Sequence, residues 1–537
     1  HNLPLYHSTF CIHTPISMQM KRKWIQIIMT LLLIQLIVAH NSYEDENGDD
    51  ETLSLELVHR HDSRFGGDDV DQVEAIKGFI QRDLFRREQM DHRKGINQGH
   101  HRRKDMEVKK EFQMSMHSGR DYAVGEYFVE VEVGTPGQSF WLVADTGSEL
   151  TWFNSIPHLQ TRKHHLQHKK HHHHHHHNHH GKHKHKHKHK GGSKTKSKKK
   201  TKSKTKSRTP TKRDDPNDPC SGIFCPHRSH SFQKLPCSSK VCTEDLSGVF
   251  SLSYCPNNSD PCLFDISYAD GSSATGYFGV ETISVNLTNG GKGKLENVTI
   301  GCTLSVLNGI TFTENTGGIL GLGFTKGSFV DRASLKYNTK FSYCLVDHLS
   351  HRNVSSYLTF GNPKVKLLDE MKTTELFLYQ PFYGVNVTGI SVGREMLKIP
   401  PTVWDFQAEG GMIIDSGTTL AALVLEAYDP VVEALTNSLK HVKRVDKSLG
   451  DLDFCFESEG FDPSSMPSLV FHFGGGVKFA PPVKSYVIDF GPNVKCLGFV
   501  PINGTGVSVI GNIMQQSHLW QIDVYQNTVS FAPSRCG

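Results

Sequence analysis

The sequence predicts an all-β protein with two lobes, each carrying a related acidic turn. Short alternating strands broken by Gly, Asn and Pro run from Gly125 to the C-terminus, beginning with 127–133 and 140–144. Long helical periods are few, and the clearest helix is predicted at 423–439. A chain of 537 residues is too long for one compact hydrophobic core, which favours two or more lobes. Segments around Asp145 and Asp415 resemble one another, so we expect each lobe to contribute one of them.

The chain begins with segments that we do not expect in the mature protein. Residues 1–17 precede the first Met and are expected to be translated upstream sequence. Residues 18–39 combine basic residues with an apolar run, which is typical of a secretory signal peptide; a signal anchor is the alternative. Residues 40–118 are charged and Gly-poor, and we interpret them as a pro-segment. The mature N-terminus is expected near 114–124.

Residues 158–213 interrupt the β pattern and consist almost wholly of His, Lys, Ser and Thr. Residues 161–213 hold 20 of the 60 Lys and Arg and no Asp or Glu. Such a segment cannot bury a core, so we expect a disordered surface loop. It is either a tolerated repeat expansion or a weak site for Zn, Cu or Ni. The remaining 40 basic against 55 acidic residues argue against a nucleic-acid-binding protein.

Cysteine usage favours an oxidising compartment, because six of the 12 Cys lie within residues 220–262. They are Cys220, Cys225, Cys237, Cys242, Cys255 and Cys262. We expect disulfides in this Cys-rich insert, since the spacings lack the paired C-x2-C pattern of a zinc site, and no metal site is predicted. Secretion is also favoured by six N-glycosylation sequons, at Asn257, Asn286, Asn297, Asn353, Asn386 and Asn503.

The chemistry is predicted to lie in two apolar strands that each end in an acidic turn. They read Leu142-Val143-Ala144-Asp145-Thr146-Gly147-Ser148 and Met412-Ile413-Ile414-Asp415-Ser416-Gly417-Thr418-Thr419. Gly allows a tight turn in which backbone N–H groups face the carboxylate, and the hydroxyl residues supply further donors. Two carboxylates held close share a proton, so one can activate water while the other protonates the substrate. Peptide hydrolysis without a covalent intermediate needs such a pair.

These paired motifs resemble those of the pepsin-type aspartic proteases, over about residues 120–537. The resemblance implies that Asp145 and Asp415 are catalytic and that Ser148 and Thr418 bond their outer oxygens. Thr146, Gly147, Ser416 and Gly417 would complete the two loops. Residues 268–272 resemble the flap hairpin, so Tyr268 would be the flap tyrosine and Trp152 its hydrogen-bond partner. Residues 318–323 and 509–512 resemble the apolar-apolar-Gly segments that pack behind each catalytic loop.

Several features are typical of the plant nepenthesin-like branch of this family: the Cys-rich insert, residues 53–62, residues 341–345 and the terminal Cys536-Gly537. Within the branch, the chain looks most similar to a member assigned to the chloroplast. Ser155 departs from the branch, which usually has Cys there, so we expect one cysteine to be unpaired or re-paired. Ala269 replaces the common flap Gly and is expected to stiffen the hairpin.

The resemblance implies a bilobal pepsin-like β fold with an N-terminal lobe at 119–365, a C-terminal lobe at 366–537 and a central cleft. It implies an aspartic endopeptidase, made as a zymogen, that cleaves polypeptides at acidic pH as a monomer without a cofactor. The signal and sequons favour an extracellular or vacuolar protein with no stable membrane insertion after signal cleavage; a chloroplast protein is the alternative. The rival function is a catalytically silent binding or inhibitor protein on the same scaffold, against which both intact motifs and Tyr268 argue. A metal-sequestering protein would explain only 158–190.

Overall fold

The computed structural model describes residues 112–118, 126–155, 218–246, 251–255, 257–268, 273–287, 291–307, 316–347, 356–379, 381–445, 452–491, 493–504 and 506–536. These residues all belong to one compact unit, 52–537. The predicted leader, signal peptide, most of the pro-segment, the insert 158–213 and Ala269 lie outside them. Within these ranges strands far outnumber helices, which confirms the all-β prediction. None of the described helices is both long and apolar enough to cross a membrane.

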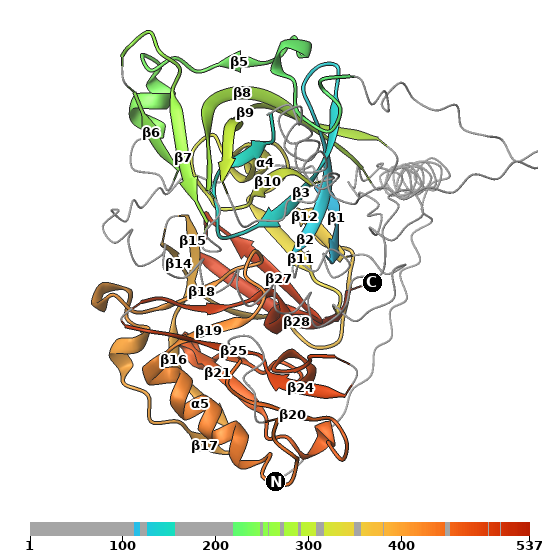
Figure 1. Ribbon diagram of the computed structural model, residues 1–537, viewed down its shortest axis with the longest axis vertical. Coiled ribbons are helices and arrows are strands. Elements are labelled where there is room, and N and C mark those ends of the chain that lie inside the picture. The colour runs from blue at the N-terminus through green and yellow to red at the C-terminus, as the bar shows by residue number, and fades with distance from the viewer. Residues whose placement is uncertain are drawn as a thin grey trace, which may run out of the picture. The chain divides into compact units, whose positions relative to one another are not determined.

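A six-stranded antiparallel sheet joins the two halves of the chain (Figure 1). Its order is β1 (Phe112–Ser118), β12 (Ser356–Phe360), β11 (Lys340–Cys344), β27 (His518–Asp523), β28 (Thr528–Arg535) and β14 (Lys372–Tyr379). The short β13 (Lys366–Leu367) also pairs with β28. Because β11 pairs directly with β27, the last strands of the chain are part of the same sheet as strands of the first half.

The first half contains the strands that present the first acidic turn. They are β2 (Tyr127–Val133), β3 (Gln138–Asp145), β4 (Thr151–Phe153), β5 (Gln233–Lys234), β6 (Leu252–Tyr254), β7 (Leu263–Ser267), β8 (Ser273–Asn286), β9 (Lys292–Leu307) and β10 (Thr316–Gly321). Strand β3 pairs in parallel with β10, which pairs antiparallel with β4, and β4 pairs in parallel with β9. Strand β3 is longer than the strand predicted at 140–144, and β2 has the predicted bounds 127–133.

The second half repeats this arrangement around the second acidic turn. Strand β18 (Met412–Ile414) pairs in parallel with β26 (Ser508–Ile510), which contacts β19 (Ala421–Val424) in antiparallel register. Strand β19 in turn pairs in parallel with β25 (Phe499–Ile502). The remaining strands are β15 (Phe382–Val385), β16 (Val387–Val392), β17 (Glu395–Met396), β20 (Cys455–Glu457), β21 (Leu469–Phe473), β22 (Lys478–Phe479), β23 (Val487–Asp489) and β24 (Val494–Leu497). The two acidic turns therefore lie in equivalent surroundings.

The described helices are short, as the sequence predicts. They are α4 (Phe329–Lys336), α5 (Leu425–Asn437) and α6 (Asn512–Gln515). The helix expected at 423–439 is shorter at both ends, because Leu423 and Val424 belong to β19 and pair with β25. Single turns of helix lie at Pro226–Arg228, Val241–Asp245, Pro401–Trp404, Phe406–Ala408, Pro463–Ser465, Gly474–Gly476 and Val483–Ser485.

Aromatic side chains fill the core beneath the central sheet. The ring centroid of Phe479 lies 5.0 Å from that of Trp520, and the Trp520 centroid lies 4.9 Å from that of Phe531. In the first half, the centroids of Phe264 and Phe278 lie 5.4 Å apart. All five side chains are almost fully buried, and such contacts position the strands that carry the acidic turns.

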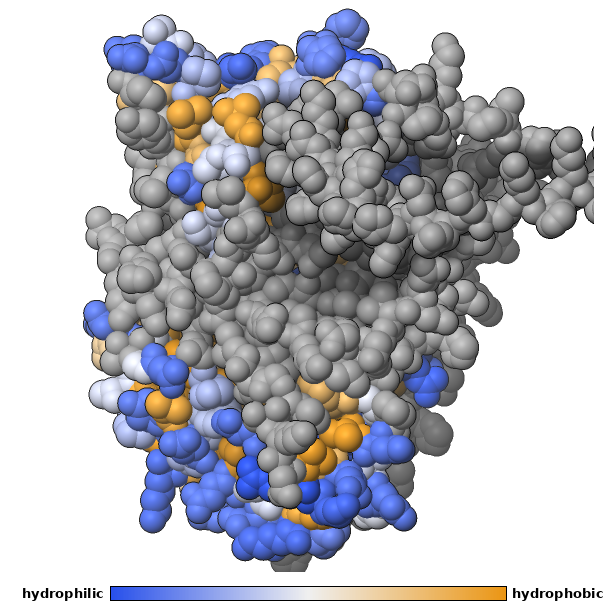
Figure 2. Space-filling view, in the orientation of Figure 1, coloured by the Kyte–Doolittle hydropathy of each residue, from blue (hydrophilic) through white to orange (hydrophobic). Residues whose placement is uncertain are grey.

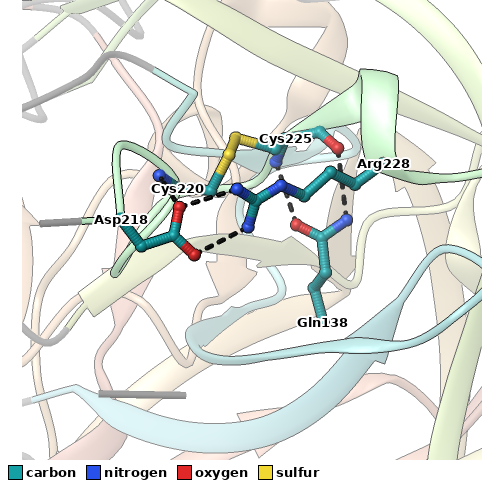
Figure 3. A network of polar contacts seen from close by, with 5 residues as sticks. All are labelled: Gln138, Asp218, Cys220, Cys225 and Arg228. Atoms are coloured by element: carbon teal, nitrogen blue, oxygen red, sulfur yellow. Dashed lines mark hydrogen bonds and ion pairs between the residues drawn. A yellow bond between two sulfur atoms is a disulfide. The ribbon is translucent and has the colours of Figure 1, made fainter. Parts of the chain in front are cut away.

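The Cys-rich insert is held by three disulfides, which confirms the expectation from its spacing. The pairs are Cys220–Cys225, Cys237–Cys255 and Cys242–Cys262, and two further disulfides join Cys344 to Cys536 and Cys455 to Cys496. Figure 3 shows how the segment 218–228 is held: the carboxylate of Asp218 accepts two hydrogen bonds from the guanidinium group of Arg228, at 2.7 and 2.8 Å. Gln138 of β3 exchanges two hydrogen bonds with the backbone of Cys225, at 3.0 and 3.2 Å. This segment, which follows the His/Lys insert, is therefore anchored to the strand that carries Asp145.

The surface of the described residues is mostly polar. On the face shown in Figure 2, hydrophilic residues dominate both ends of the described surface, with hydrophobic residues in smaller groups between them. Only four large hydrophobic side chains among the described residues are exposed: Leu304, Leu368, Met396 and Leu425. Leu304 lies in β9, Leu368 directly after β13, Met396 in β17 and Leu425 in α5, so they do not by themselves indicate a docking surface.

Candidate active site

The first predicted catalytic residue, Asp145, ends strand β3 and is 1% exposed. The backbone N–H of Gly147 donates to its Oδ1 at 2.9 Å. The hydroxyl of Ser148 donates to its Oδ2 at 2.9 Å. The strand buries the base of the side chain, and the turn that follows aims one donor at each carboxyl oxygen.

The second predicted catalytic residue, Asp415, follows strand β18 and is fully buried. Its Oδ1 accepts from the N–H of Gly417 at 2.8 Å, and its Oδ2 accepts from the hydroxyl of Thr418 at 2.6 Å. The donors occupy the same positions relative to the aspartate as in the first loop. Both loops thus hold a carboxyl group in the same way.

Four hydrogen bonds join the two loops across 270 residues of sequence. The N–H of Thr146 donates to Ser416 Oγ at 3.0 Å, and the N–H of Ser416 donates to Thr146 Oγ1 at 2.8 Å. Each hydroxyl then donates to a carbonyl of the opposite strand: Ser416 to Ala144 at 2.9 Å and Thr146 to Ile414 at 3.4 Å. The structure therefore brings the two Asp-Thr/Ser-Gly motifs together at one site.

A glycine packs behind each loop, where a side chain would collide with the backbone. A Cβ on Gly321 would lie 2.6 Å from the carbonyl carbon of Glu149. A Cβ on Gly511 would lie 2.1 Å from the carbonyl oxygen of Leu420. These are the glycines of the two apolar-apolar-Gly segments, and Gly321 lies directly opposite Asp145 in the parallel pair β3–β10.

The predicted flap tyrosine contacts its predicted partner. The indole N–H of Trp152, in β4, donates to the hydroxyl of Tyr268, which follows β7, and the ring centroids lie 6.3 Å apart. Both side chains are buried. The turn of the hairpin, 269–272, lies outside the described residues.

Sequence reasoning placed Asn512 in the segment behind the second loop without a role for its side chain, and it missed Gln515; both belong to the short helix α6. Asn512 Nδ2 donates to the carbonyl of Ser416 at 3.0 Å, and Gln515 Nε2 donates to the carbonyl of Asp415 at 3.0 Å. Both residues are fully buried. The available signal is that Asn512 and Gln515 lie in an otherwise apolar stretch shortly after the strand β26, since buried amides need partners.

A tyrosine of the central sheet lies close to the second loop. Tyr343, in β11, is fully buried, and its hydroxyl donates to Gln515 Oε1 at 2.7 Å. Burial, together with the charge of Asp415, raises the pKa of Tyr343 well above its usual value. The hydroxyl is therefore neutral and keeps its proton for the hydrogen bond.

Among the described cysteines, the one that forms no disulfide is Cys302, which is buried in β9. Its thiol forms a hydrogen bond with Ser155, and burial raises its pKa to about 12. Strand β4, which precedes Ser155, pairs with β9 so that Phe153 lies opposite Cys302. The serine at the position where we expected a cysteine is therefore next to the thiol that forms no disulfide.

Two groups of Cys and His side chains place their ligand atoms within 4.8 Å of one another. They are Cys220 with Cys225 and His227, and Cys237 with Cys242 and Cys255. All five cysteines are in disulfides, so their sulfurs are not available as thiolate ligands.

Comparison with protein families gives two matches that together span most of the described chain. Residues 127–218 and 205–362 match the family described as xylanase inhibitor N-terminal. Residues 382–533 match the family described as xylanase inhibitor C-terminal. The first of these matches ends at residue 362 and the second begins at residue 382.

Comparison with individual proteins gives relatives named as proteases. The chain is 31% identical to aspartyl protease family protein 2 of Arabidopsis thaliana over 437 residues, covering 79% of this chain and 74% of that protein. It is 28% identical to aspartic proteinase nepenthesin-1 of Nepenthes gracilis over 505 residues, covering 90% and 94%. Among solved structures, conglutin gamma, a basic 7S globulin from lupine seeds, matches with a TM-score of 0.55 at 15% identity, covering 79% and 94%. That likeness concerns the fold alone, and it confirms the predicted bilobal pepsin-like fold.

Proposed function

The chain belongs to the plant aspartic protease family that includes the nepenthesins, and we propose that it is an active aspartic endopeptidase with Asp145 and Asp415 as its catalytic pair. The observation that carries the proposal is the bonding between the two loops. Thr146 and Ser416 exchange backbone and side-chain hydrogen bonds, and each neighbouring carboxyl has one backbone donor and one hydroxyl donor. An inhibitor or storage protein has no need for such a matched pair of carboxyl groups.

In the proposed mechanism, the two carboxyl groups hold one proton between them. The ionised group takes a proton from water while the water oxygen bonds to the peptide carbonyl carbon, and the protonated group gives its proton to the carbonyl oxygen. The tetrahedral intermediate then breaks its C–N bond as the amide nitrogen takes the proton that the first carboxyl group accepted from water, and a hydroxyl of the intermediate returns its proton to the other carboxylate as the new C=O forms. Ser148 and Thr418 orient the carboxyl groups through their hydroxyl donors. Trp152 positions Tyr268, which we expect to contact the substrate from the flap.

An acidic optimum follows from the shared proton. Activity requires that the pair has lost one proton and kept the other, and carboxyl groups keep a proton only at acidic pH unless their surroundings intervene. The rate should therefore fall as the pH rises towards neutrality and the second proton is lost. Polypeptides would be cleaved between bulky apolar residues. Activity that continues to rise up to and beyond neutral pH would contradict this part of the proposal.

The rival function is binding without catalysis. It is favoured by the family matches, which are described as xylanase inhibitor halves, and by the fold likeness to a seed globulin. Against it, both aspartates, their four donors and the flap tyrosine are present and in contact with their partners. The two functions differ in one measurable property, since only a protease loses activity on replacement of either aspartate.

We further propose that the chain is made as a zymogen in the secretory pathway and becomes extracellular or vacuolar. The five disulfides fit an oxidising compartment. Four sequon asparagines are exposed, at Asn257, Asn286, Asn297 and Asn503, as glycan attachment requires. Mass loss on treatment of the plant-expressed protein with an N-glycosidase would support this route. An unglycosylated protein recovered from chloroplasts would contradict it.

The His-rich run supports a second, weaker proposal, namely transition-metal binding by the insert 158–213. Clustered imidazoles are ligands for Zn, Cu and Ni. Retention of the protein on immobilised nickel should disappear when residues 158–190 are deleted. Retention that survives the deletion would show that the insert is not the metal-binding segment.

The proposed activity is tested by cleavage of denatured haemoglobin across pH 3–7 with purified precursor and with the matched variants Asp145→Asn and Asp415→Asn. We expect pepstatin-sensitive cleavage at low pH by the wild-type protein and none by either variant. Asn keeps the size of the side chain, so loss of activity would reflect the lost carboxyl group. A folded, processed wild-type protein that cleaves nothing would favour the binding function.

A further inference from the structure

We propose that Gln515 is a positioning residue for the proposed catalytic pair, because its side-chain amide holds Asp415 by the backbone carbonyl. This inference rests on the proposed protease function, and it assigns a role to a residue outside both Asp-Thr/Ser-Gly motifs. Gln515 donates to the backbone carbonyl of Asp415. It acts on the position of the residue that carries the carboxyl group.

The two loops differ in how the aspartate carbonyl is bonded. In the first loop, the backbone N–H of Leu322 donates to the carbonyl of Asp145 at 2.8 Å. In the second loop, the equivalent backbone N–H, that of Asn512, donates instead to the carbonyl of Thr418 at 2.7 Å. The Asp415 carbonyl is bonded by Gln515 Nε2 at 3.0 Å. A side chain thus takes over a bond that the backbone makes in the other half of the molecule.

The amide of Gln515 is fully buried and bonded at both ends. Its nitrogen donates to two carbonyls, that of Asp415 and that of Ile510, the latter at 2.6 Å. Its oxygen accepts from the hydroxyl of Tyr343 at 2.7 Å. Carbonyls can only accept, so the nitrogen must face the loop and the oxygen must face the tyrosine. The side chain has one orientation that satisfies every partner.

The partners of Gln515 belong to rigid parts of the fold. Tyr343 lies in β11 of the central sheet, where it pairs with Trp520 of β27. The indole N–H of Trp520 donates to the backbone carbonyl of Gln515 at 3.0 Å. Ile510 is the last residue of β26, and its carbonyl also accepts a hydrogen bond from the N–H of Asp415 at 3.2 Å. Gln515 therefore connects the second catalytic loop to the sheet that joins the two halves.

Loss of the amide should affect the rate of catalysis more than substrate binding. Two buried carbonyls would lose a donor, and the loop would move to recover one, which shifts Asp415 relative to Asp145. Misplacement of a catalytic group by about 1 Å can cost about 100-fold in rate. The side-chain hydrogen bonds of Gln515 go to Asp415, Ile510 and Tyr343 rather than to Tyr268 of the flap, so KM should change little.

The neighbouring Gln516 provides a matched control. It is also buried, at 1% exposure, but its Nε2 donates to the hydroxyl of Tyr127 at 2.9 Å. Gln515→Leu and Gln516→Leu remove the same group from adjacent positions, so both should lower the melting temperature. We expect kcat, per active molecule at the optimum pH, to fall about 10- to 100-fold in Gln515→Leu with KM within about twofold. Gln516→Leu should keep kcat within about threefold.

A second variant, Gln515→Glu, separates positioning from packing through its pH dependence. At low pH a protonated carboxyl keeps one O–H donor for the loop carbonyls and an oxygen for Tyr343. As the pH rises the carboxyl ionises, loses its donor and repels the carbonyl oxygens. The ratio of its kcat to that of the wild-type protein should therefore fall with rising pH across pH 3–6. The ratio for Gln515→Leu should stay level.

An inactive wild-type protein would count against the protease function alone. In that case, hydrogen exchange in the second loop still tests whether Gln515 positions Asp415. Peptides covering 412–424 should exchange faster in Gln515→Leu than in the wild-type protein, and Gln516→Leu should match the wild-type protein there. Equal kcat and equal exchange in the two Leu variants would overturn the positioning role. A level pH ratio for a folded Gln515→Glu would do the same.

Discussion

The bonds between the two catalytic loops predict a large stability cost for Ser416→Ala. The Ser416 hydroxyl accepts from the N–H of Thr146 at 3.0 Å and donates to the carbonyl of Ala144 at 2.9 Å, in a fully buried position. The alanine leaves both backbone groups without this partner, and a buried polar group without its partner costs about 1–3 kcal/mol. Two such groups, with some relaxation, give about 2–4 kcal/mol. At roughly 2 °C per kcal/mol for a chain of this size, the melting temperature should fall by about 4–8 °C.

Ser342→Ala is the matched control for this measurement. Ser342 is also fully buried, in β11, but its hydroxyl has no hydrogen-bond partner within the described part of the chain. Removal of a hydroxyl without a partner should leave the melting temperature unchanged or raise it slightly. Differential scanning fluorimetry of both variants at one pH and salt concentration gives the comparison. Equal shifts in the two variants would refute the claim that the loops hold one another.

Three further predictions follow from single contacts. In Ser155→Cys, the new cysteine should form a disulfide with Cys302 and raise the free energy of unfolding by about 2–4 kcal/mol. The thiol of Cys302 should then no longer react in a thiol titration in denaturant, and a reactive thiol would contradict this. Burial lowers the pKa of His518, so the neutral form is favoured in the folded protein, and stability should be lost as the pH falls below about 6.5. The melting temperature should therefore drop less between pH 7 and 4 in His518→Gln than in the wild-type protein, and an equal drop would count against the histidine. Tyr268→Phe, which removes the acceptor of the Trp152 indole, should lower kcat/KM about tenfold, whereas a wild-type value would leave the hydroxyl without a role.

The sequence predicts the parts of the site that depend on local pattern. The strand at 127–133 alternates apolar and polar residues, and its bounds are those of β2. Asp145 and Asp415 stand out because each follows an apolar strand and precedes Gly and hydroxyl residues whose N–H and O–H groups can donate to the carboxylate in a tight turn. The contact of Trp152 with Tyr268 was predicted by resemblance, because the two residues are 116 positions apart and no local pattern joins them.

Contacts between distant segments could not be predicted from the sequence. Leaving out Cys11 of the expected upstream sequence, eleven of the 12 cysteines remain, so one is left without a disulfide partner, but only the structure identifies it as Cys302 in β9. Gln515 looks like any polar residue at the end of a short helix, and its partner Tyr343 lies 172 positions away. The helix predicted at 423–439 starts late, because pairing with β25 outweighs helix propensity at Leu423.

A crystal structure of the mature protein with pepstatin at acidic pH tests the central claim most directly. We predict that the central hydroxyl of the inhibitor lies within hydrogen-bond distance of a carboxyl oxygen of both Asp145 and Asp415. The carboxyl groups should keep their donors Gly147 and Gly417 in the complex. Carboxyl groups too far apart to share a proton, or an inhibitor bound elsewhere, would contradict the catalytic pair and leave the fold as a binding scaffold.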